Sequence, residues 1–534
     1  MDATFMIEGK TYIITLVASK VDPVFGLRRS ATEIYLQVAL GLPPSLQMKC
    51  LKNCQEKVNP DERVTAKAFC TTNCYGQLAF KWRLYWFDRV DMTEPFDLSE
   101  LNEVPLETLS NMVTNPVDEL ELAFKSNTLK PERKYILQLK ATRPNKVFGE
   151  LRYTMLMNNA PKEGECDIQP KTGVAMTTMF NLTCMNWTDP DPPINYEFSY
   201  KLKDVKTVFF SATLRTSQIL VARENLPIGD PNRNNEIDIY VNIKDRFEGE
   251  TELHFIVKVD PPGGELGLSS MDSMLSGDSL SKMIADGDPQ KALAMAGVFA
   301  SVLNHINGND STSGNLTAEE QERKNNESQQ VDEFKQAIMK SLFDVKVENM
   351  DTLLQISGIT QALTDNAEKL SPTSQEYGLM LSNASVTSLT KLSKGESSFK
   401  NVDSAVTNLA NTIGQLVVAA TKPRDDQNGT INNEEIIRAQ KSISMISDLH
   451  DAKLRYLVTN EGPSTSSTKH MTLQSEKVSI RNMGKNGNSA SNCSFKTPSP
   501  EVFGFGDIVK DINATISQLD SVTIKVYEIH SKND

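Results

Sequence analysis

The chain has 534 residues, which is too many for one hydrophobic core, so the length predicts roughly three to five domains. Hydrophobic residues make up 39% of the chain, which favours folded globular domains over a disordered chain. The formal net charge of -13 disfavours nucleic acid and anionic membrane surfaces as partners, because both are bound through concentrated Lys and Arg.

The seven cysteines are distributed unevenly. An even number lie in the N-terminal part, at Cys50, Cys54, Cys70, Cys74, Cys166 and Cys184, and Cys493 lies far from them. Such a cluster predicts local disulfides in an oxidising compartment. The first four cysteines could instead hold zinc, but each pair has three intervening residues where zinc knuckles usually have two. We expect disulfides and leave the pairing of these four open.

No segment is typical of a transmembrane helix or a signal peptide. The longest apolar run, residues 292–303, is much shorter than the roughly 20 residues that span a bilayer. The first residues include Asp2 and Glu8, lack a basic start and alternate as a strand does. Disulfides without an export signal lead us to expect a segment of a longer protein.

The first half of the chain reads as β-structure. We expect residues 1–40 to be the end of a β-sandwich domain and residues 41–160 to form a β-domain with four cysteines. In the second, Phe80, Trp82, Leu84 and Trp86 recur with a period of two, which predicts a half-buried strand. Residues 161–262 repeat the pattern, with further strands expected at 180–184, 196–202, 237–243 and 253–259.

Residues 263–460 read as a helical domain. Apolar residues at helical spacing predict helices over residues 289–303, 402–420 and 436–457, and Ser371-Pro372 marks the start of another. We expect a mobile polar loop over residues 308–330. Residues 461–534 read as an incomplete β part, whose strand at 522–528 would need partners beyond Asp534.

No catalytic or metal-binding group stands out. The five histidines are widely separated, and phosphate-loop, dinucleotide-binding and nucleophile-elbow motifs are absent. Residues 424–435 resemble a calcium-binding EF-hand loop, but Arg424 occupies the first ligand position, so we expect an ordinary turn there. We therefore expect no enzyme activity, no catalytic residue, no metal and no cofactor.

Three asparagines are the best candidates for glycosylation. Asn309, Asn315 and Asn326 each begin an Asn-x-Ser/Thr motif and share the expected polar loop.

The β half resembles the receptor-for-egg-jelly (REJ) region of polycystin-family proteins. One similar stretch is Asn53-Cys54 and Asn73-Cys74 before the strand to Trp82. The most specific one runs from Gly164-Glu-Cys166 through Pro170, Gly173 and Phe180 to Cys184-Met-Asn-Trp-Thr-Asp189. A third comprises residues 285–290 and 300–304, similar to the helical stretch after the REJ region. The resemblance implies tandem β-sandwiches of fibronectin-III type and a Cys166–Cys184 disulfide.

The rest of the chain resembles the front of a GAIN domain, the module that precedes the membrane in these proteins. Its His-Leu-Ser/Thr cleavage motif is absent, since His530 is followed directly by Ser531. Self-cleavage and ion conduction therefore do not carry over to this chain.

The resemblance implies a non-enzymatic extracellular segment of a polycystin-type, channel-associated membrane receptor. Its expected roles are to bind an extracellular protein or glycan and to transmit signal or force to the membrane. It would lie outside the plasma membrane, joined to it only through a downstream region, with a polycystin-type channel as a possible partner. The alternative is a secreted binding protein that works alone.

Overall fold

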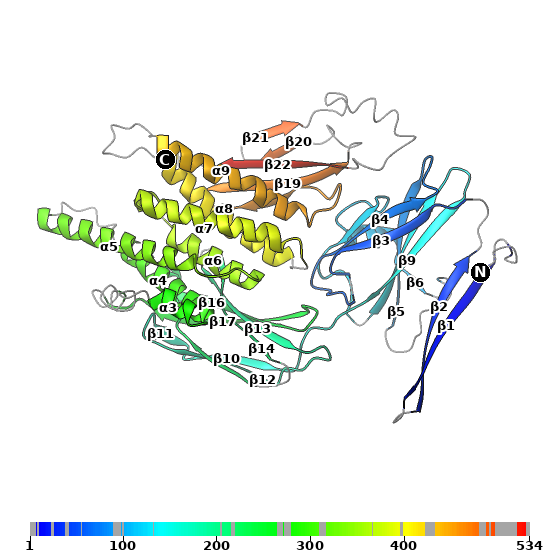
Figure 1. Cartoon of the computed structure of the whole chain (residues 1–534), viewed down its shortest axis with the longest axis horizontal. Coiled ribbons are helices and arrows are strands. Elements are labelled where there is room, and N and C mark those ends of the chain that lie inside the picture. Colours follow the sequence, from blue (N-terminus) through cyan, green and yellow to red (C-terminus); the bar gives the residue numbers. More distant parts are fainter. Residues whose placement is uncertain are drawn as a thin grey trace.

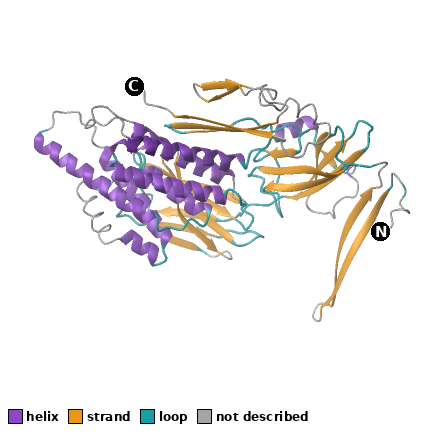
Figure 2. Ribbon diagram, turned by 45° about the horizontal axis from the view of Figure 1, so that its top comes forward, coloured by secondary structure: helices purple, strands orange, loops and turns teal. Residues whose placement is uncertain are grey.

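The computed structural model has β-sheets in the N-terminal half and mainly helices in the C-terminal half (Figures 1 and 2), as the sequence predicted. It describes residues 10–22, 26–37, 42–54, 56–88, 101–131, 133–202, 205–214, 219–263, 279–308, 317–365, 367–395, 399–421, 433–479, 487–490, 493–496 and 521–529, with single residues at 7, 98 and 271. No helix in these ranges is long and apolar enough to cross a bilayer.

The N-terminal strands form a two-stranded antiparallel ribbon. β1 (Thr11–Asp22) and β2 (Gly26–Gln37) pair along their whole length, from Thr11 opposite Gln37 to Asp22 opposite Gly26. In Figures 1 and 2 the ribbon projects away from the other sheets. We expected the end of a β-sandwich here, and the described part of residues 1–40 is this ribbon.

The next strands form two sheets, which we call the first β region. One sheet has the order β3 (Ser45–Lys52), β4 (Val64–Thr72), β7 (Glu121–Phe124), and the other β6 (Asn102–Glu103), β5 (Ala79–Asp88), β8 (Arg133–Thr142), β9 (Phe148–Leu156). A short helix, α1 (Leu106–Met112), precedes β7. On β5, Trp82 and Leu84 face the main core as predicted, but Tyr85 and Phe87 are buried as well, in a smaller cluster with Ile136. β5 is thus covered on both faces.

The second β region also has two sheets. The smaller has the order β10 (Glu165–Gln169), β12 (Phe180–Met185), β15 (Leu220–Glu224). The larger has the order β11 (Thr172–Val174), β17 (Glu250–Asp260), β16 (Glu236–Lys244), β13 (Ile194–Leu202), β14 (Val205–Leu214). Only β11 and β17 pair in parallel among these strands. A 3₁₀ turn, Pro231–Arg233, precedes β16.

The helical region contains the four helices that the sequence predicted and others that it did not. Its helices are α3 (Ser279–Ala285), α4 (Pro289–Gly308), α5 (Ala318–Leu342), α6 (Met350–Leu363), α7 (Pro372–Leu392), α8 (Phe399–Thr421) and α9 (Asn433–Leu454), with a 3₁₀ turn at Ala367–Lys369. The Ser371 side chain accepts a hydrogen bond from Ser374 N, so it caps α7 as expected. The apolar face expected on α8, including Val402, Leu409 and Ile413, is fully buried.

The expectation of a polar loop over residues 308–330 was wrong from Ala318 onward, because α5 begins there. Thr317 and Glu320 cap each other's backbone N–H groups, which offsets the loss of hydrogen bonds at the helix start. Asn326 consequently lies on an exposed helical face. The other two glycosylation candidates, Asn309 and Asn315, lie outside the described residues.

The second β region and the helices share one hydrophobic core. α4 and α6 pack on β14, and buried residues from both parts, such as Phe198 and Phe299, belong to a single cluster. The close approach depends on Gly358 in α6, since a Cβ atom there would lie 2.3 Å from Thr207 Oγ1. The core therefore continues across residue 263, where we expected a domain boundary.

The C-terminal strands pack on α8 and α9, on the side of the helical region opposite the second β region (Figure 1). β18 (Ser464–Ser467), β19 (Met471–Ser479) and β22 (Ser521–Ile529) form one antiparallel sheet, and β20 (Gly487–Ala490) pairs with β21 (Cys493–Lys496). β22 pairs with β19 from Met471 opposite Ile529 to Ser479 opposite Ser521. The expectation that this strand needs partners beyond Asp534 was wrong, because its partner lies upstream in the chain.

We expect Gly358→Ala to destabilise the chain by about 1–3 kcal/mol, because the added methyl group would push α6 away from β14. Gly263→Ala is the matched control, since a Cβ atom there would have nothing within 4 Å. Thermal unfolding followed by circular dichroism measures both. Equal midpoints for the two variants would contradict the close helix–sheet contact.

Candidate functional site

The two Asn-Cys motifs form small disulfide-closed turns. Cys50 pairs with Cys54 and Cys70 with Cys74, each pair four residues apart. Asn53 and Asn73, which precede the second cysteine of each pair, have φ angles of 51° and 57°. Asparagine tolerates this left-handed conformation better than most residues, which gives a physical reason for an asparagine at this position.

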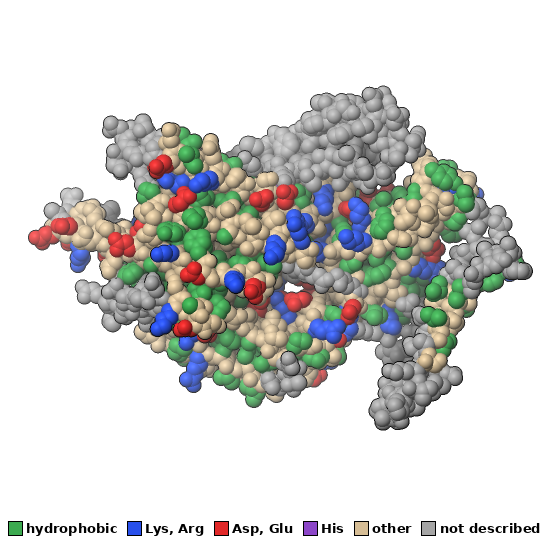
Figure 3. Space-filling model, viewed as in Figure 1, with side chains coloured by type: hydrophobic (Ala, Val, Ile, Leu, Met, Phe, Trp, Pro, Cys, Tyr) green, Lys and Arg blue, Asp and Glu red, His purple; other side chains and the backbone are tan. Residues whose placement is uncertain are grey.

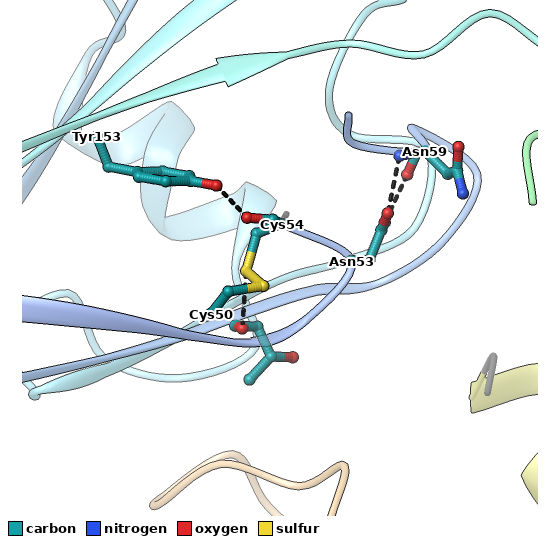
Figure 4. Close-up of a disulfide and its surroundings, with 6 residues drawn as sticks. Cys50, Asn53, Cys54, Asn59 and Tyr153 are labelled. Atoms are coloured by element: carbon teal, nitrogen blue, oxygen red, sulfur yellow. Dashed lines mark hydrogen bonds between the residues drawn. A yellow bond between two sulfur atoms is a disulfide. The ribbon is translucent and has the colours of Figure 1, made fainter. Parts of the chain in front are cut away.

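The first of these turns shapes the loop that follows it. Figure 4 shows Asn53 and Asn59 side by side: Asn53 Nδ2 donates to Asn59 O, and Asn59 N donates to Asn53 Oδ1, both at 2.8 Å. The hydroxyl of Tyr153 in β9 donates to Cys54 O. The loop between Cys54 and Asn59 is thus held at both ends.

This loop reaches the second β region. Asn59 Nδ2 donates to Phe247 O at 2.5 Å, and Arg246 Nη2 lies 3.1 Å from a Glu56 carboxylate oxygen. Next to it, the amide of Asn158 donates to Asn59 Oδ1 at 2.9 Å and to Asp245 Oδ2 at 2.6 Å. The buried Asn158 side chain therefore joins the two β regions.

The motif that runs from Gly164 to Asp189 packs one end of the second β region. Gly164 lies against the Trp187 ring, and Gly173 against Phe180, so closely that a Cβ atom on either glycine would clash. Cys166 and Cys184 are opposite each other on β10 and β12 and form a disulfide. These contacts explain why glycine, aromatic and cysteine residues recur in the motif.

The motif ends at the same junction. Asp189, its last residue, accepts a hydrogen bond from Asp191 N at 2.7 Å through Oδ1, and Asp191 O accepts one from Arg246 N. The Asp191 carboxylate contacts the Lys57 ammonium from the first β region. Both family-like motifs therefore contribute to one contact between the two β regions.

Three carboxylates converge at this junction, and we call them the aspartate cluster: Asp189, Asp191 and Asp245. One oxygen from each lies within 4.8 Å of the others. Burial raises the pKa of Asp189, and the neighbouring carboxylates of Asp245 and Asp191 add to the rise. Burial also raises the pKa of Asp245, although the Asn158 amide and two backbone N–H groups oppose it. Within the part of the chain that the structure describes, these three residues are the group that could hold a metal ion.

A second contact joins the first β region to the turn after α9. Arg63 and Glu461 form a bidentate ion pair, in which Nη1 and Nη2 each donate to one carboxylate oxygen, and each side chain is only 10% exposed. Glu121 Oε2 accepts from Thr459 N at 2.9 Å, and Asn460 Nδ2 donates to Glu119 Oε1 at 2.7 Å.

Lys52 extends this contact. Its ammonium lies 3.3 Å from Tyr456 Oη and 4.3 Å from the centre of the Tyr456 ring. Figure 3 shows charged side chains of both signs gathered in the middle of the molecule, between the helices and the first β region.

Sequence reasoning found part of this site. The cysteines and Asp189 stood in the quoted motifs, but Asn158, Asp191 and Asp245 carried no sequence signal and meet only in the fold. Most of the EF-hand-like stretch lies outside the described residues, although Glu435, its last position, is buried in α9. The Cys493 side chain and the His530-Ser531 pair are also not among the parts that the structure describes.

Asp61, whose carboxyl interacts with Asp245 of the aspartate cluster, should make the stability of the fold depend on pH. Its pKa is raised to about 6, chiefly by burial, with Glu250 and Asp245 adding to the rise. The stability associated with the protonated carboxyl is fully present below the unfolded-state pKa of about 4 and is lost as pH rises through about 6.

We therefore expect Asp61→Asn to stabilise the chain by about 1 kcal/mol near pH 7.4 and to have little effect below about pH 4, because the side chain is only partly buried. Denaturant titrations at the two pH values measure this difference, with the exposed Asp286→Asn as control. A destabilised variant near pH 7.4 would contradict the burial of an ionised Asp61.

Comparison with known proteins places these motifs in a family. The family model described as "REJ domain" matches residues 1–298. The chain is 22% identical over 299 residues to the human protein "Polycystin family receptor for egg jelly", and the match covers 52% of this chain and 12% of that protein. It is 24% identical over 189 residues to "Polycystin-1-like protein 1" of Oryzias latipes, covering 35% of this chain and 6% of that protein.

The human "Polycystin-1-like protein 1" is 26% identical over 112 residues, which cover 21% of this chain and 4% of that protein. The chain thus spans about an eighth or less of the length of these relatives. Among solved structures, the chicken CNTN1 FN1–FN3 domains match at 12% identity with a TM-score of 0.22, covering 45% of this chain and 76% of that one. The family model covers more than half of the residues, so the chain belongs to the REJ domain family.

Proposed function

We propose that this chain is a non-enzymatic part of the extracellular portion of a polycystin-type membrane receptor, and that it transmits force or signal toward the membrane. Membership of the REJ domain family supports a receptor-related extracellular segment. The observation that carries the mechanical role is the double attachment of the first β region. It contacts the second β region through Asn158 and the helical region through Arg63.

A load applied to the first β region would be shared between these two contacts. If only the peptide link near residue 160 joined the regions, they would turn freely about it, since flexible linkers set no orientation. The two contacts lie on different segments, residues 245–249 and 456–461, and so oppose rotation about either one. The bidentate Arg63–Glu461 pair adds directional preference, because guanidinium and carboxylate meet in a fixed plane.

The binding role remains part of the proposal. An extracellular protein or glycan is the ligand class, and a polycystin-type channel is the proposed partner at the membrane. Exposed Asn326 on α5 would carry a glycan without disturbing a packed face, and Asn309 and Asn315 are proposed with it.

The finer fold assignment is also proposed. The paired sheets of the two β regions suit fibronectin-III-like sandwiches over residues 41–160 and 161–262. The helices followed by the β18–β19–β22 sheet suit a GAIN-like order, with helices over 263–460 and strands over 461–534. The packing of that sheet on α8 and α9 supports this assignment.

The alternative is a secreted binding protein that works alone. The full transcript discriminates between the two: a membrane anchor encoded in it supports the receptor, and a complete transcript without one supports the secreted protein.

Removing the Arg63–Glu461 pair should loosen the contact between the first β region and the helical region. Arg63→Met keeps the apolar stem but leaves a mostly buried carboxylate without its cation, at a cost on the order of 2 kcal/mol or more. We expect faster hydrogen exchange over residues 456–461 and a broader distribution of molecular dimensions in X-ray scattering.

The matched control is Arg152→Met, because Arg152 is 41% exposed and pairs with Glu150 within its own strand, β9. The control should leave both measurements unchanged. Unaltered hydrogen exchange and scattering in Arg63→Met would contradict the proposal that two contacts hold the first β region.

A further inference from the structure

We propose that the aspartate cluster, together with Asn158, is a calcium-binding site at the junction of the two β regions. No sequence motif predicted it, because its residues come from three separate segments: Asn158 from the end of the first β region, Asp189 and Asp191 from the turn after β12, and Asp245 from the turn after β16. The proposal adds a ligand to the molecule and stands independently of the proposed function.

The spacing of the carboxylates suits one calcium ion. Calcium binds oxygen at about 2.3–2.6 Å, so two oxygens on opposite sides of one ion are roughly 4.6–5.2 Å apart. One oxygen each from Asp189, Asp191 and Asp245 lie within 4.8 Å of one another. All three can therefore contact a common ion with little movement. Magnesium binds at about 2.0–2.1 Å and requires a tighter, more regular set of ligands.

A buried amide oxygen next to the cluster needs a partner. Asn158 is 0% exposed, its Nδ2 lies 2.6 Å from Asp245 Oδ2, and its Oδ1 makes no hydrogen bond. Turning the amide over would instead place Oδ1 against the oxygens of Asp245 and Asn59, where acceptor faces acceptor. With the amide turned over, a cation held between Oδ1 and Asp245 Oδ2 would satisfy both oxygens, and amide oxygens are common calcium ligands.

A second oxygen is also without a partner. Asp189 Oδ1 accepts from Asp191 N, but its Oδ2 is buried and makes no hydrogen bond. A carboxylate oxygen removed from water without a donor is costly, and coordination to an ion offsets that cost. Gly249 closes one side of the site, since a Cβ atom there would lie 2.4 Å from Asn158 Nδ2.

The charge balance leaves room for a divalent ion. Among the described residues, Lys57 is the one cation in contact with the cluster, through Asp191. Three ionised carboxylates against one ammonium leave an excess of two negative charges, which favours binding of a divalent cation. The Lys57 side chain is 22% exposed and can turn toward solvent when the ion binds Asp191. Lys57 and calcium would then compete for the same carboxylate.

Calorimetric titration of the full chain with calcium chloride tests the site. We expect saturable binding in the range of extracellular calcium modules, roughly 10⁻⁴–10⁻³ M, and weaker binding of magnesium. Asp189→Asn removes one charged ligand but keeps the acceptor for Asp191 N, so it should weaken calcium binding about tenfold or more. Asp167→Asn is the matched control, an exposed aspartate of the same region paired with Lys171, and should bind calcium as the unmodified chain does.

Lys57→Met supplies a readout that does not depend on losing a ligand. Because it removes the competing ammonium, it should tighten calcium binding severalfold. Absence of saturable binding up to about 10 mM calcium in the folded chain, well above the range of extracellular modules, would overturn the proposal. So would binding that Asp189→Asn leaves unchanged. Neither result bears on the Arg63–Glu461 contact, which is tested separately.

Discussion

The buried amide of Asn158 is the interaction on which the arrangement of the two β regions depends. It donates to Asn59 on one side and to Asp245 on the other, and its own backbone N–H donates to Val58 O. Asn158 lies where the chain passes from the first β region to the second, so the link between them is itself hydrogen-bonded to both. Leaving such a buried polar group without its partners costs more than the hydrogen bonds contribute when they form.

The two family motifs acquire a physical meaning from this junction. The Cys50–Cys54 turn, with Asn53 in a left-handed conformation, directs the following loop toward the second β region. The glycine, aromatic and disulfide contacts of the second motif hold the turn that carries Asp189. In both motifs the cysteines do not make the contact themselves. Their disulfides position the backbone, and the polar residues that follow them join the two β regions.

Local pattern predicted the elements that have a regularly spaced apolar face. β5 and β16 carry apolar residues with a period of two, and α8 carries them at helical spacing, so one buried face of each could be named in advance, although β5 is covered on its other face as well. α5 was missed because its first half is polar on all sides, although Val331, Phe334 and Ile338 in its second half recur at helical spacing and are buried. α6 was missed because it is buried on nearly all sides and so is not amphipathic. The pairing of β22 with β19 and the Asn158–Asp245 contact, which joins residues 87 positions apart, depend on long-range topology that one sequence does not display.

The central claim is that Asn158 fixes the first β region against the second. Small-angle X-ray scattering of Asn158→Ala, compared with Asn115→Ala, tests it most directly. Asn115 is also buried and hydrogen-bonded, but only within the first β region. The account predicts that Asn158→Ala increases the maximum dimension and broadens the distance distribution while Asn115→Ala leaves the overall shape unchanged. Identical scattering from both folded variants would contradict it.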